Sequence, residues 1–175
     1  RALGVQQPVL LLGHVPLAQV NEAVAADLRL TVYNRESIAA LGAVATEEKP
    51  ARVHVKIETG TGRQGVLLQE LPAFADLIAT TPGVKLEGAS THYANIEDTL
   101  SHEYAEKQVR EFAAALTLLA EKDLRPAVVH TACTAASILF PETHHTMLRA
   151  GIGLYGLWPS RETLQAAKIW QQVLP

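Results

Sequence analysis

The sequence of 175 residues is poor in cysteine, carries little excess charge of either sign and has no long hydrophobic run. A single cysteine, Cys133, excludes an internal disulfide and fits a reducing compartment such as the cytoplasm. The 15 basic and 18 acidic residues leave a net charge of −3 and form no basic run, which argues against a nucleic-acid or anionic-membrane partner. The sequence has no stretch of about 18 apolar residues and therefore predicts no bilayer span.

Apolar segments of strand character alternate with segments of helical periodicity along the chain. The predicted strands are residues 8–12, 29–33, 53–58, 84–93 (running into a loop), 127–130 and 146–149, and the predicted helices lie around residues 16–26, 35–43, 71–78 and 101–122. Such alternation is typical of right-handed βαβ units and a parallel sheet, either an open doubly wound sheet or a (β/α)8 barrel. A complete barrel takes about 250 residues, so about six units would make three quarters of one.

Residues 60–65 carry three glycines at the spacing Gly-x-Gly-x-x-Gly, directly after a predicted strand. Because Glu87 lies 22 positions beyond Gly65, this pattern allows a dinucleotide-binding interpretation, and with it a nicotinamide-dependent oxidoreductase. That interpretation needs a helix that starts at the glycines, so that its first amides face a pyrophosphate. Pro72 favours a later start, since proline belongs in the first helical turn. The sequence therefore favours a tight turn with glycine at positive φ.

Four segments resemble, in this order, the N-terminal barrel domain of alanine racemases, which are pyridoxal-phosphate enzymes. They are residues 55–65 (VKIETGTGRQG), 87–94 (EGASTHYA), 130–137 (HTACTAAS) and 148–157 (LRAGIGLYGL). The resemblance extends weakly to Arg1. It implies an α/β fold: a partial (β/α)8 TIM-type barrel over residues 1–160 with about six of eight units, strands three to eight. Residues 161–175 would then start the connection to a missing C-terminal β-domain.

The resemblance also implies a set of cofactor-binding residues at the carboxyl ends of strands, where (β/α)8 enzymes place their sites. Arg149 matches the arginine that faces the ring nitrogen of pyridoxal 5′-phosphate, and a guanidinium does not readily give up its proton. His92 would line the cofactor pocket. Thr134 takes the position of a phosphate-binding serine, and the backbone amides of Gly151 and Ile152 would hold the same phosphate.

Two further residues match the catalytic side of the family's site. Arg63 matches an arginine near the substrate carboxylate, and Lys56 matches a lysine that some members carry as a carbamate that holds this arginine in place. Because carbamylation needs an uncharged amine, Lys56 is expected to be partly buried with a lowered pKa. Glu58 and Cys133 depart from the family pattern, which more often has aspartate and asparagine there. No spaced set of ligands predicts a metal site.

The activity implied by the resemblance is interconversion of L- and D-alanine, which supplies D-alanine for cell-wall peptidoglycan, in a cytoplasmic homodimer. The family places its Schiff-base lysine on the first barrel strand and a catalytic tyrosine in the partner's C-terminal domain, and neither has a match before Pro8 or after Pro159. The sequence therefore predicts a fragment of a longer parent, inactive by itself. A non-catalytic pyridoxal-phosphate-binding barrel protein is the alternative, although Arg63 and residues 151–157 favour the racemase.

Overall fold

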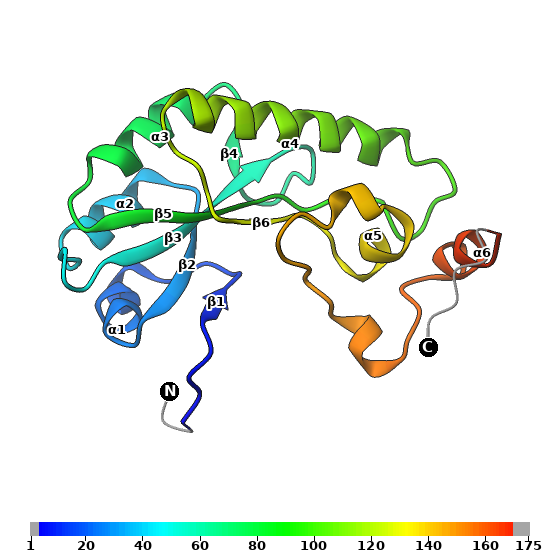
Figure 1. Ribbon diagram of the computed structural model, residues 1–175, viewed down its shortest axis with the longest axis horizontal. Coiled ribbons are helices and arrows are strands. Elements are labelled where there is room, and N and C mark those ends of the chain that lie inside the picture. The colour runs from blue at the N-terminus through cyan, green and yellow to red at the C-terminus, as the bar shows by residue number, and fades with distance from the viewer. Residues whose placement is uncertain (1–3, 170–175) are drawn as a thin grey trace.

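The computed structural model describes residues 4–169 and shows a parallel sheet flanked by helices (Figure 1). The strands are β1 (Val9–Leu11), β2 (Leu28–Val32), β3 (Ala51–Glu58), β4 (Val66–Leu67), β5 (Val84–Ser90) and β6 (Val128–His130). The α-helices are α1 (Val20–Ala25), α2 (Arg35–Gly42), α3 (Leu71–Thr80), α4 (Glu103–Glu121), α5 (Thr134–Leu139) and α6 (Arg161–Ile169), and the short 3-10 helices are η1 (Leu17–Gln19), η2 (Pro141–Thr143) and η3 (Ile152–Tyr155). The described strands pair in parallel in the order β1-β2-β3-β5-β6, with β4 beside the end of β3.

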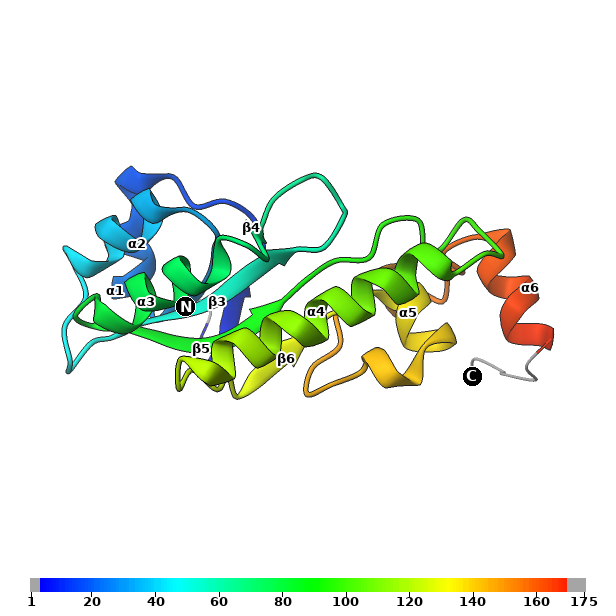
Figure 2. The ribbon, with the colours of Figure 1, turned by 90° about the horizontal axis from the view of Figure 1, so that it is seen from above.

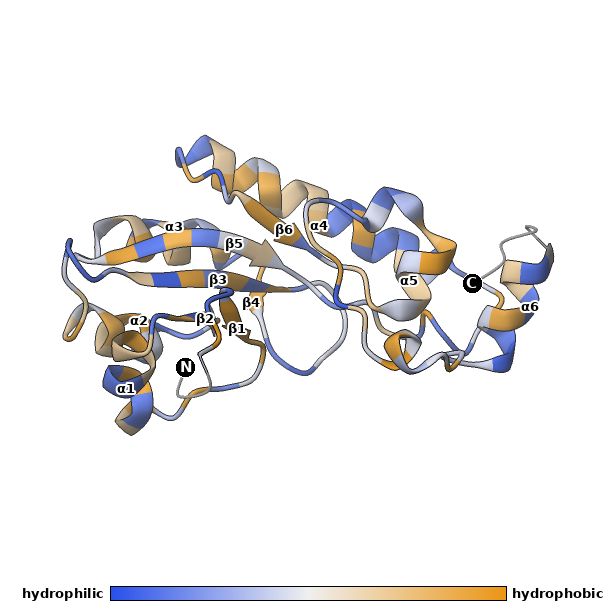
Figure 3. Ribbon diagram, turned by 60° about the horizontal axis from the view of Figure 1, so that its bottom comes forward, coloured by the Kyte–Doolittle hydropathy of each residue, from blue (hydrophilic) through white to orange (hydrophobic). Residues whose placement is uncertain are grey.

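Strand β3 lies at the centre of the sheet and is buried along both of its faces. Val53, Val55 and Ile57 pack into the main apolar core together with residues of α1 to α4. Because side chains alternate along a strand, His54 and Lys56 lie on the opposite face, where they are 2% and 7% exposed. The sheet therefore turns an apolar face to the helices and a polar face to its inner side, and Figure 3 shows the alternation along β3 and β5.

The helices divide the molecule into two apolar clusters. Seen from above, α3 and α4 lie across β5 and β6 near the main core (Figure 2). A smaller cluster at the other end joins α5 and α6 to the loop after β5, and it includes Tyr93, Ile96 and Phe140. None of the described helices combines the length and apolar character of a membrane span. Of the predicted connection at residues 161–175, α6 is described and residues 170–175 lie outside the described part of the chain.

The strand predicted at residues 146–149 is wrong. His145 has a φ of 45°, which turns the chain immediately before this segment. The backbone amides of Thr146 and Met147 then both donate to one acceptor, the carbonyl oxygen of Val129, at 3.1 and 3.2 Å. Two successive amides that converge on one carbonyl cannot continue as a ladder, in which alternate residues bond to different partners. The segment therefore runs along β6 as an irregular chain.

A second difference is β4, which was not expected. Val66 and Leu67 pair in parallel with Ile57 and Glu58, so the chain returns to the end of β3 directly after the glycine-rich turn. The sequence analysis assigned these residues to no element, and so short an apolar run cannot distinguish a strand from a loop. Pairing with β3 pins the second end of the glycine-rich loop, which positions the side chains that the loop carries.

Candidate functional site

A cavity of about 230 Å³ opens on the polar inner face of the sheet. Strands β2, β3, β5 and β6 and the loops that follow the strands contribute its lining. The lining residues are Leu12, Thr31, Lys56, Arg63, Gln64, Ser90, His92, His130 and Arg149. Four residues that the sequence assigns to the site, Lys56, Arg63, His92 and Arg149, thus come together in one place.

Arg149 is held by the ends of two neighbouring strands. Its Nη2 donates to the carbonyl oxygens of Thr91 at 2.9 Å and Thr131 at 2.7 Å, and lies 3.3 Å from Nδ1 of His92. Its Nη1 donates to the carbonyl oxygen and to Nδ1 of His130, both at 2.8 Å. Within the described residues, the Nε–H group has no protein partner. Arg149 therefore lines the cavity with its terminal nitrogens anchored and one donor unused.

Lys56 is 7% exposed, so the expectation that it is buried is confirmed. Burial lowers its pKa to about 7, and the positive charges of Arg149 and Arg63 add to this effect. No ion pair involves Lys56 among residues 4–169. At neutral pH a large share of these amines is therefore uncharged, which is the state that a nucleophilic amine requires.

The glycine-rich loop after β3 is built around the carboxylate of Glu58. The backbone amide of Gly60 donates to Glu58 Oε1 at 2.6 Å, and that of Arg63 donates to Oε2 at 3.2 Å. Burial acts to raise the pKa of Glu58, but its hydrogen bonds with the backbone of the loop outweigh burial and lower it. The loop thus places Arg63 at the mouth of the cavity. The hydrogen bonds from the loop amides to the carboxylate of Glu58 hold the loop in this position.

This arrangement overturns the dinucleotide-binding interpretation of the glycine motif. The amides that would face a pyrophosphate already bond to Glu58, and α3 begins only at Leu71. No helix starts at the glycines, so their amides receive no helix dipole. The three glycines instead have φ values of 131°, 66° and 149°, and the expectation of a turn with glycine at positive φ is confirmed.

His92 lies in a buried network that the sequence analysis missed. Gln108 on α4 is 0% exposed; its Nε2 donates to the carbonyl oxygen of His92 and to Thr59 Oγ1, both at 3.1 Å, and its Oε1 accepts from the amide of Ala94 at 2.9 Å. Burial lowers the pKa of His92 to about 4, with the charges of Lys56 and nearby arginines contributing. The imidazole is therefore neutral at pH 7. Helical periodicity indicates that Gln108 is buried, but nothing local indicates its partners.

A smaller cavity of about 140 Å³ surrounds the start of α5, and its lining residues are Glu97, Cys133, Thr134, Ala135, Gly151, Ile152 and Pro159. Thr134 Oγ1 accepts hydrogen bonds from the amides of Gly151 at 3.1 Å and Gly153 at 3.3 Å. A hydroxyl that accepts twice still has its own proton to donate. The structure thus brings together the residues predicted to bind phosphate. In this structure the Gly151 amide donates to the hydroxyl of Thr134.

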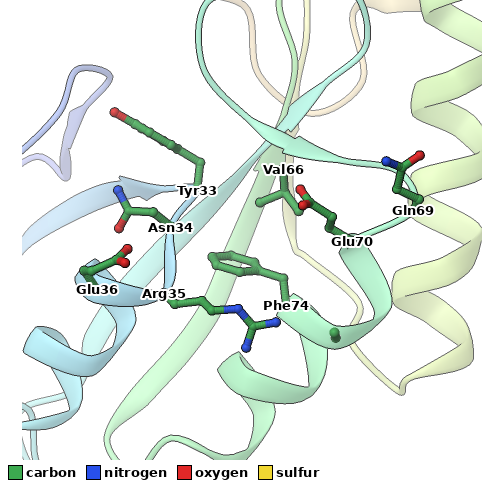
Figure 4. A pocket seen from close by; sticks show the side chains of 9 residues that line it. Tyr33, Asn34, Arg35, Glu36, Val66, Gln69, Glu70 and Phe74 are labelled. Atoms are coloured by element: carbon green, nitrogen blue, oxygen red, sulfur yellow. The ribbon is translucent and has the colours of Figure 1, made fainter.

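Another pocket, of about 490 Å³, lies apart from these residues between the starts of α2 and α3. Figure 4 shows Asn34 and Glu36 on one side of Phe74, and Gln69 and Glu70 on the other. None of the residues that the sequence analysis assigns to the site lines this pocket. The candidate site is therefore the cavity beside Arg149.

Sequence reasoning also missed three residues behind Arg149: His54, Glu87 and His130. The histidines are 2% and 0% exposed and contact each other, although 76 positions separate them. One signal was available for His54, because strand alternation places it on the same face as Lys56. Glu87 was considered only as the acidic residue of the dinucleotide-binding pattern and as the start of one matching segment, and His130 only as the start of another.

Comparison with known proteins relates the chain to one family. Residues 1–159 match the family described as alanine racemase, N-terminal domain. The chain is 34% identical over 175 residues to "Alanine racemase 1" of Oceanobacillus iheyensis, covering 99% of this chain and 46% of that protein. It is 38% identical over 163 residues to an alanine racemase of Desulfovibrio desulfuricans, covering 93% and 44%. The chain thus spans less than half the length of these relatives.

Solved structures agree in fold. The alanine racemase of Clostridium difficile 630 in complex with cycloserine superposes with a TM-score of 0.87 at 29% identity, over 94% of this chain and 45% of that one. The enzyme of Bacillus anthracis with bound L-Ala-P gives a TM-score of 0.84 at 32% identity, over 92% and 42%. The predicted partial α/β barrel is confirmed. The chain belongs to the alanine racemase N-terminal domain family.

Proposed function

We propose that this chain is the cofactor-binding part of an alanine racemase that uses pyridoxal 5′-phosphate. The observation that carries the proposal is Arg149, whose Nη1 and Nη2 are anchored by strand ends while Nε–H faces no protein acceptor among the described residues. A pyridine nitrogen accepts one hydrogen bond in the plane of its ring, which this donor can supply. A guanidinium that keeps its proton leaves the ring nitrogen unprotonated.

The charge of the cavity supports an anionic ligand. Lys56, Arg63 and Arg149 line it, and none of its lining residues is acidic. Buried positive charge without a counter-ion is costly, so such a cavity favours a phosphate or a carboxylate. The volume of about 230 Å³ suits a small amino acid beside a flat ring. Two permanent guanidinium charges, with an amine that is charged in a share of the molecules, face one small space and are a stronger indication than any of them alone.

Each remaining residue has a defined task in this proposal. When bound, the cofactor withdraws electrons from the Cα–H bond of the amino acid attached to it. Thr134 would donate its hydroxyl proton to the phosphate, with the amides of Gly151 and Ile152 beside it. His92, neutral at pH 7, would line the ring. Arg63 would hold the substrate carboxylate at the mouth of the cavity.

The substrate, the compartment, the oligomeric state and the domain bounds also belong to the proposal. The substrate is alanine, and D-alanine would serve cell-wall peptidoglycan in the cytoplasm. The complete protein would act as a homodimer. Residues 1–160 would form the cofactor-binding barrel part, and residues 161–175 would begin the connection to a C-terminal β-domain, with residues 170–175 outside the described chain.

Exchange of the alanine Cα–H tests the proposal. The complete protein, incubated with L-alanine in D2O, is expected to form D-alanine and to incorporate deuterium at Cα; dialysis against hydroxylamine stops both, and pyridoxal 5′-phosphate restores them. Residues 1–175 expressed alone are expected not to racemise. A complete protein that binds the cofactor without exchanging Cα–H would instead support the non-catalytic barrel protein.

Lys56 is expected to carry a carbamate. The neutral Nζ adds to the carbon of CO2: a C–N bond forms, the electron pair of one C=O π bond moves to its oxygen, and one Nζ proton goes to solvent, so a neutral amine becomes an anion near Arg63 and Arg149. In [13C]bicarbonate at pH 8, we expect one carbamate carbon signal per chain in the NMR spectrum. Because the pKa of Lys56 is about 7, the neutral amine and the signal decrease as pH falls from 8 to 6.

Two variants assign that signal. Lys56→Arg is expected to abolish it, since a guanidinium does not form a carbamate under these conditions. Lys85→Arg should leave it unchanged, because the Lys85 side chain is 52% exposed and pairs with Glu47 at 3.0 Å. A signal that survives Lys56→Arg, or none in the unmodified protein, would show that Lys56 acts as a free amine.

A further inference from the structure

Behind Arg149, three side chains form a line that ends at a carboxylate. Arg149 Nη1 lies 2.8 Å from Nδ1 of His130, and His130 Nε2 lies 2.9 Å from Nδ1 of His54. His54 Nε2 in turn lies 3.2 Å from Oε2 of Glu87. The members come from β6, β3 and β5, so the line crosses the inner face of the sheet.

The Arg149 end of this line sets which atom donates and which accepts in each of its hydrogen bonds. A guanidinium only donates, so Nδ1 of His130 must accept and its proton must be on Nε2. That proton is donated to Nδ1 of His54, whose own proton is then on Nε2 and is donated to Glu87. We propose that Glu87, His54 and His130 form a one-way hydrogen-bonded chain that positions the guanidinium of Arg149.

Burial and neighbouring charges keep both imidazoles in the neutral form that the chain needs. His130 is 0% exposed, and burial lowers its pKa to about 3, with Arg149 adding to the effect. Burial also lowers the pKa of His54, against the opposing effect of Glu87. A doubly protonated His130 would turn an N–H group toward the guanidinium and break the line at its first bond.

The far end of the chain is anchored by two arginines. Glu87 Oε2 accepts from Nε of Arg29 on β2 at 3.2 Å, and Oε1 lies 3.9 Å from Nε of Arg52 on β3. The carboxylate therefore has a fixed orientation on the side away from the cavity. An acceptor held in this way can select one tautomer of His54, which a freely rotating carboxylate would not do.

A break in strand register makes room for the chain. Val53 pairs with Leu86, but His54 pairs with Gly88, so Glu87 is an extra residue in β5 opposite the junction. An extra residue changes the face on which the following side chains lie. At Gly88 an added Cβ would lie 2.4 Å from Nδ1 and 2.5 Å from Cε1 of His54, so the ring occupies the space that glycine leaves.

The consequence for the site is a guanidinium that cannot rotate. Nη1 is fixed by His130 and Nη2 by strand-end carbonyls, which leaves Nε–H as the donor without a partner among the described residues, on a side chain that lines the cavity. The identity of the acceptor in the cavity rests on the proposed function, whereas the direction of the hydrogen bonds from Arg149 to Glu87 does not. Glu87 and His54 act through Arg149 and are positioning residues.

Imidazole nitrogen shifts test the chain directly. In the complete protein labelled with 15N-histidine, the shifts of His54 and His130 (assigned with His54→Gln and His130→Gln) are expected to show protonated Nε2 and unprotonated Nδ1 from pH 8 to 6. Gly88→Ala is expected to replace the single tautomer of His54 by a mixture, because Cβ displaces the His54 ring, while His130 keeps its proton on Nε2 beside Arg149. Gly13→Ala is the matched control, since a Cβ there meets nothing within 4 Å.

Two substitutions at Glu87 complete the test. Glu87→Gln keeps an acceptor oxygen for His54 and should keep its tautomer, whereas Glu87→Leu removes the acceptor that selects this tautomer and should produce a mixture at His54, as in Gly88→Ala. Protonated Nδ1 in the unmodified protein, or unchanged shifts in both Gly88→Ala and Glu87→Leu, would overturn the proposal. Because these shifts are read without added alanine or added cofactor, failure of the racemase proposal would not alter them.

Discussion

Replacing Arg149 with methionine is expected to destabilise the complete protein by about 3–5 kcal/mol and to abolish racemisation. Methionine replaces the aliphatic part of the side chain but carries no hydrogen-bond donor, so the carbonyl oxygens of Thr91, His130 and Thr131 lose their shared donor. Each buried polar group left unsatisfied costs about 1–3 kcal/mol. Urea unfolding followed by circular dichroism measures the loss, and the Cα–H exchange assay measures the activity.

The same substitution should raise the pKa of Lys56 and of His92, because the charge of Arg149 helps to lower both. Arg149→Lys is expected to lie between wild type and Arg149→Met, since one ammonium group cannot reach both strand ends in the planar geometry of a guanidinium. Arg110→Met serves as the control: the Arg110 side chain is 70% exposed and its ion pair with Glu106 spans 3.9 Å. A loss under about 1 kcal/mol in Arg149→Met would mean that Arg149 is not the anchor described.

Alanine at Gly65 is expected to cost about 3 kcal/mol or more and to raise KM for alanine. Gly65 has a φ of 149°, and an added Cβ would lie 2.5 Å from the backbone nitrogen of Glu58 and 2.8 Å from its Cα. Backbone atoms cannot move aside as a flexible side chain can. The glycine-rich loop must therefore shift, and with it Arg63, which we propose as the ligand of the substrate carboxylate.

Gly62→Ala is the matched comparison within the same loop. Gly62 has a φ of 66°, but an added Cβ there meets nothing within 4 Å, so only the left-handed backbone conformation is penalised, by about 1 kcal/mol. Thermal unfolding of the two variants, together with KM and kcat for alanine, separates strain from steric overlap. Equal losses in Gly62→Ala and Gly65→Ala would show that the contact with Glu58 is relieved at little cost.

Neither α5 nor α6 was predicted, but local pattern was sufficient for the strands β1, β2, β3, β5 and β6, for the helices α1 to α4 and for the turn at residues 60–65. These features depend on neighbours in sequence: side-chain period, proline in a first helical turn, and glycine where φ is positive. The meeting of Lys56 and His92 was also predictable, because parallel strands bring their carboxyl ends to one edge; Arg149 reaches the same cavity from a segment that is not a strand. Whether these residues bind the cofactor remains a prediction.

Tertiary structure alone decided the irregular course of residues 146–149, the strand β4 and the network behind Arg149. His54 meets His130 across 76 positions and Glu87 across 33, and both contacts depend on the extra residue that shifts the register of β5 against β3. The sequence by itself determined which residues face inward, since alternation is a property of one strand. It could not determine which inward residues touch, because that depends on the register between strands that are distant in the chain.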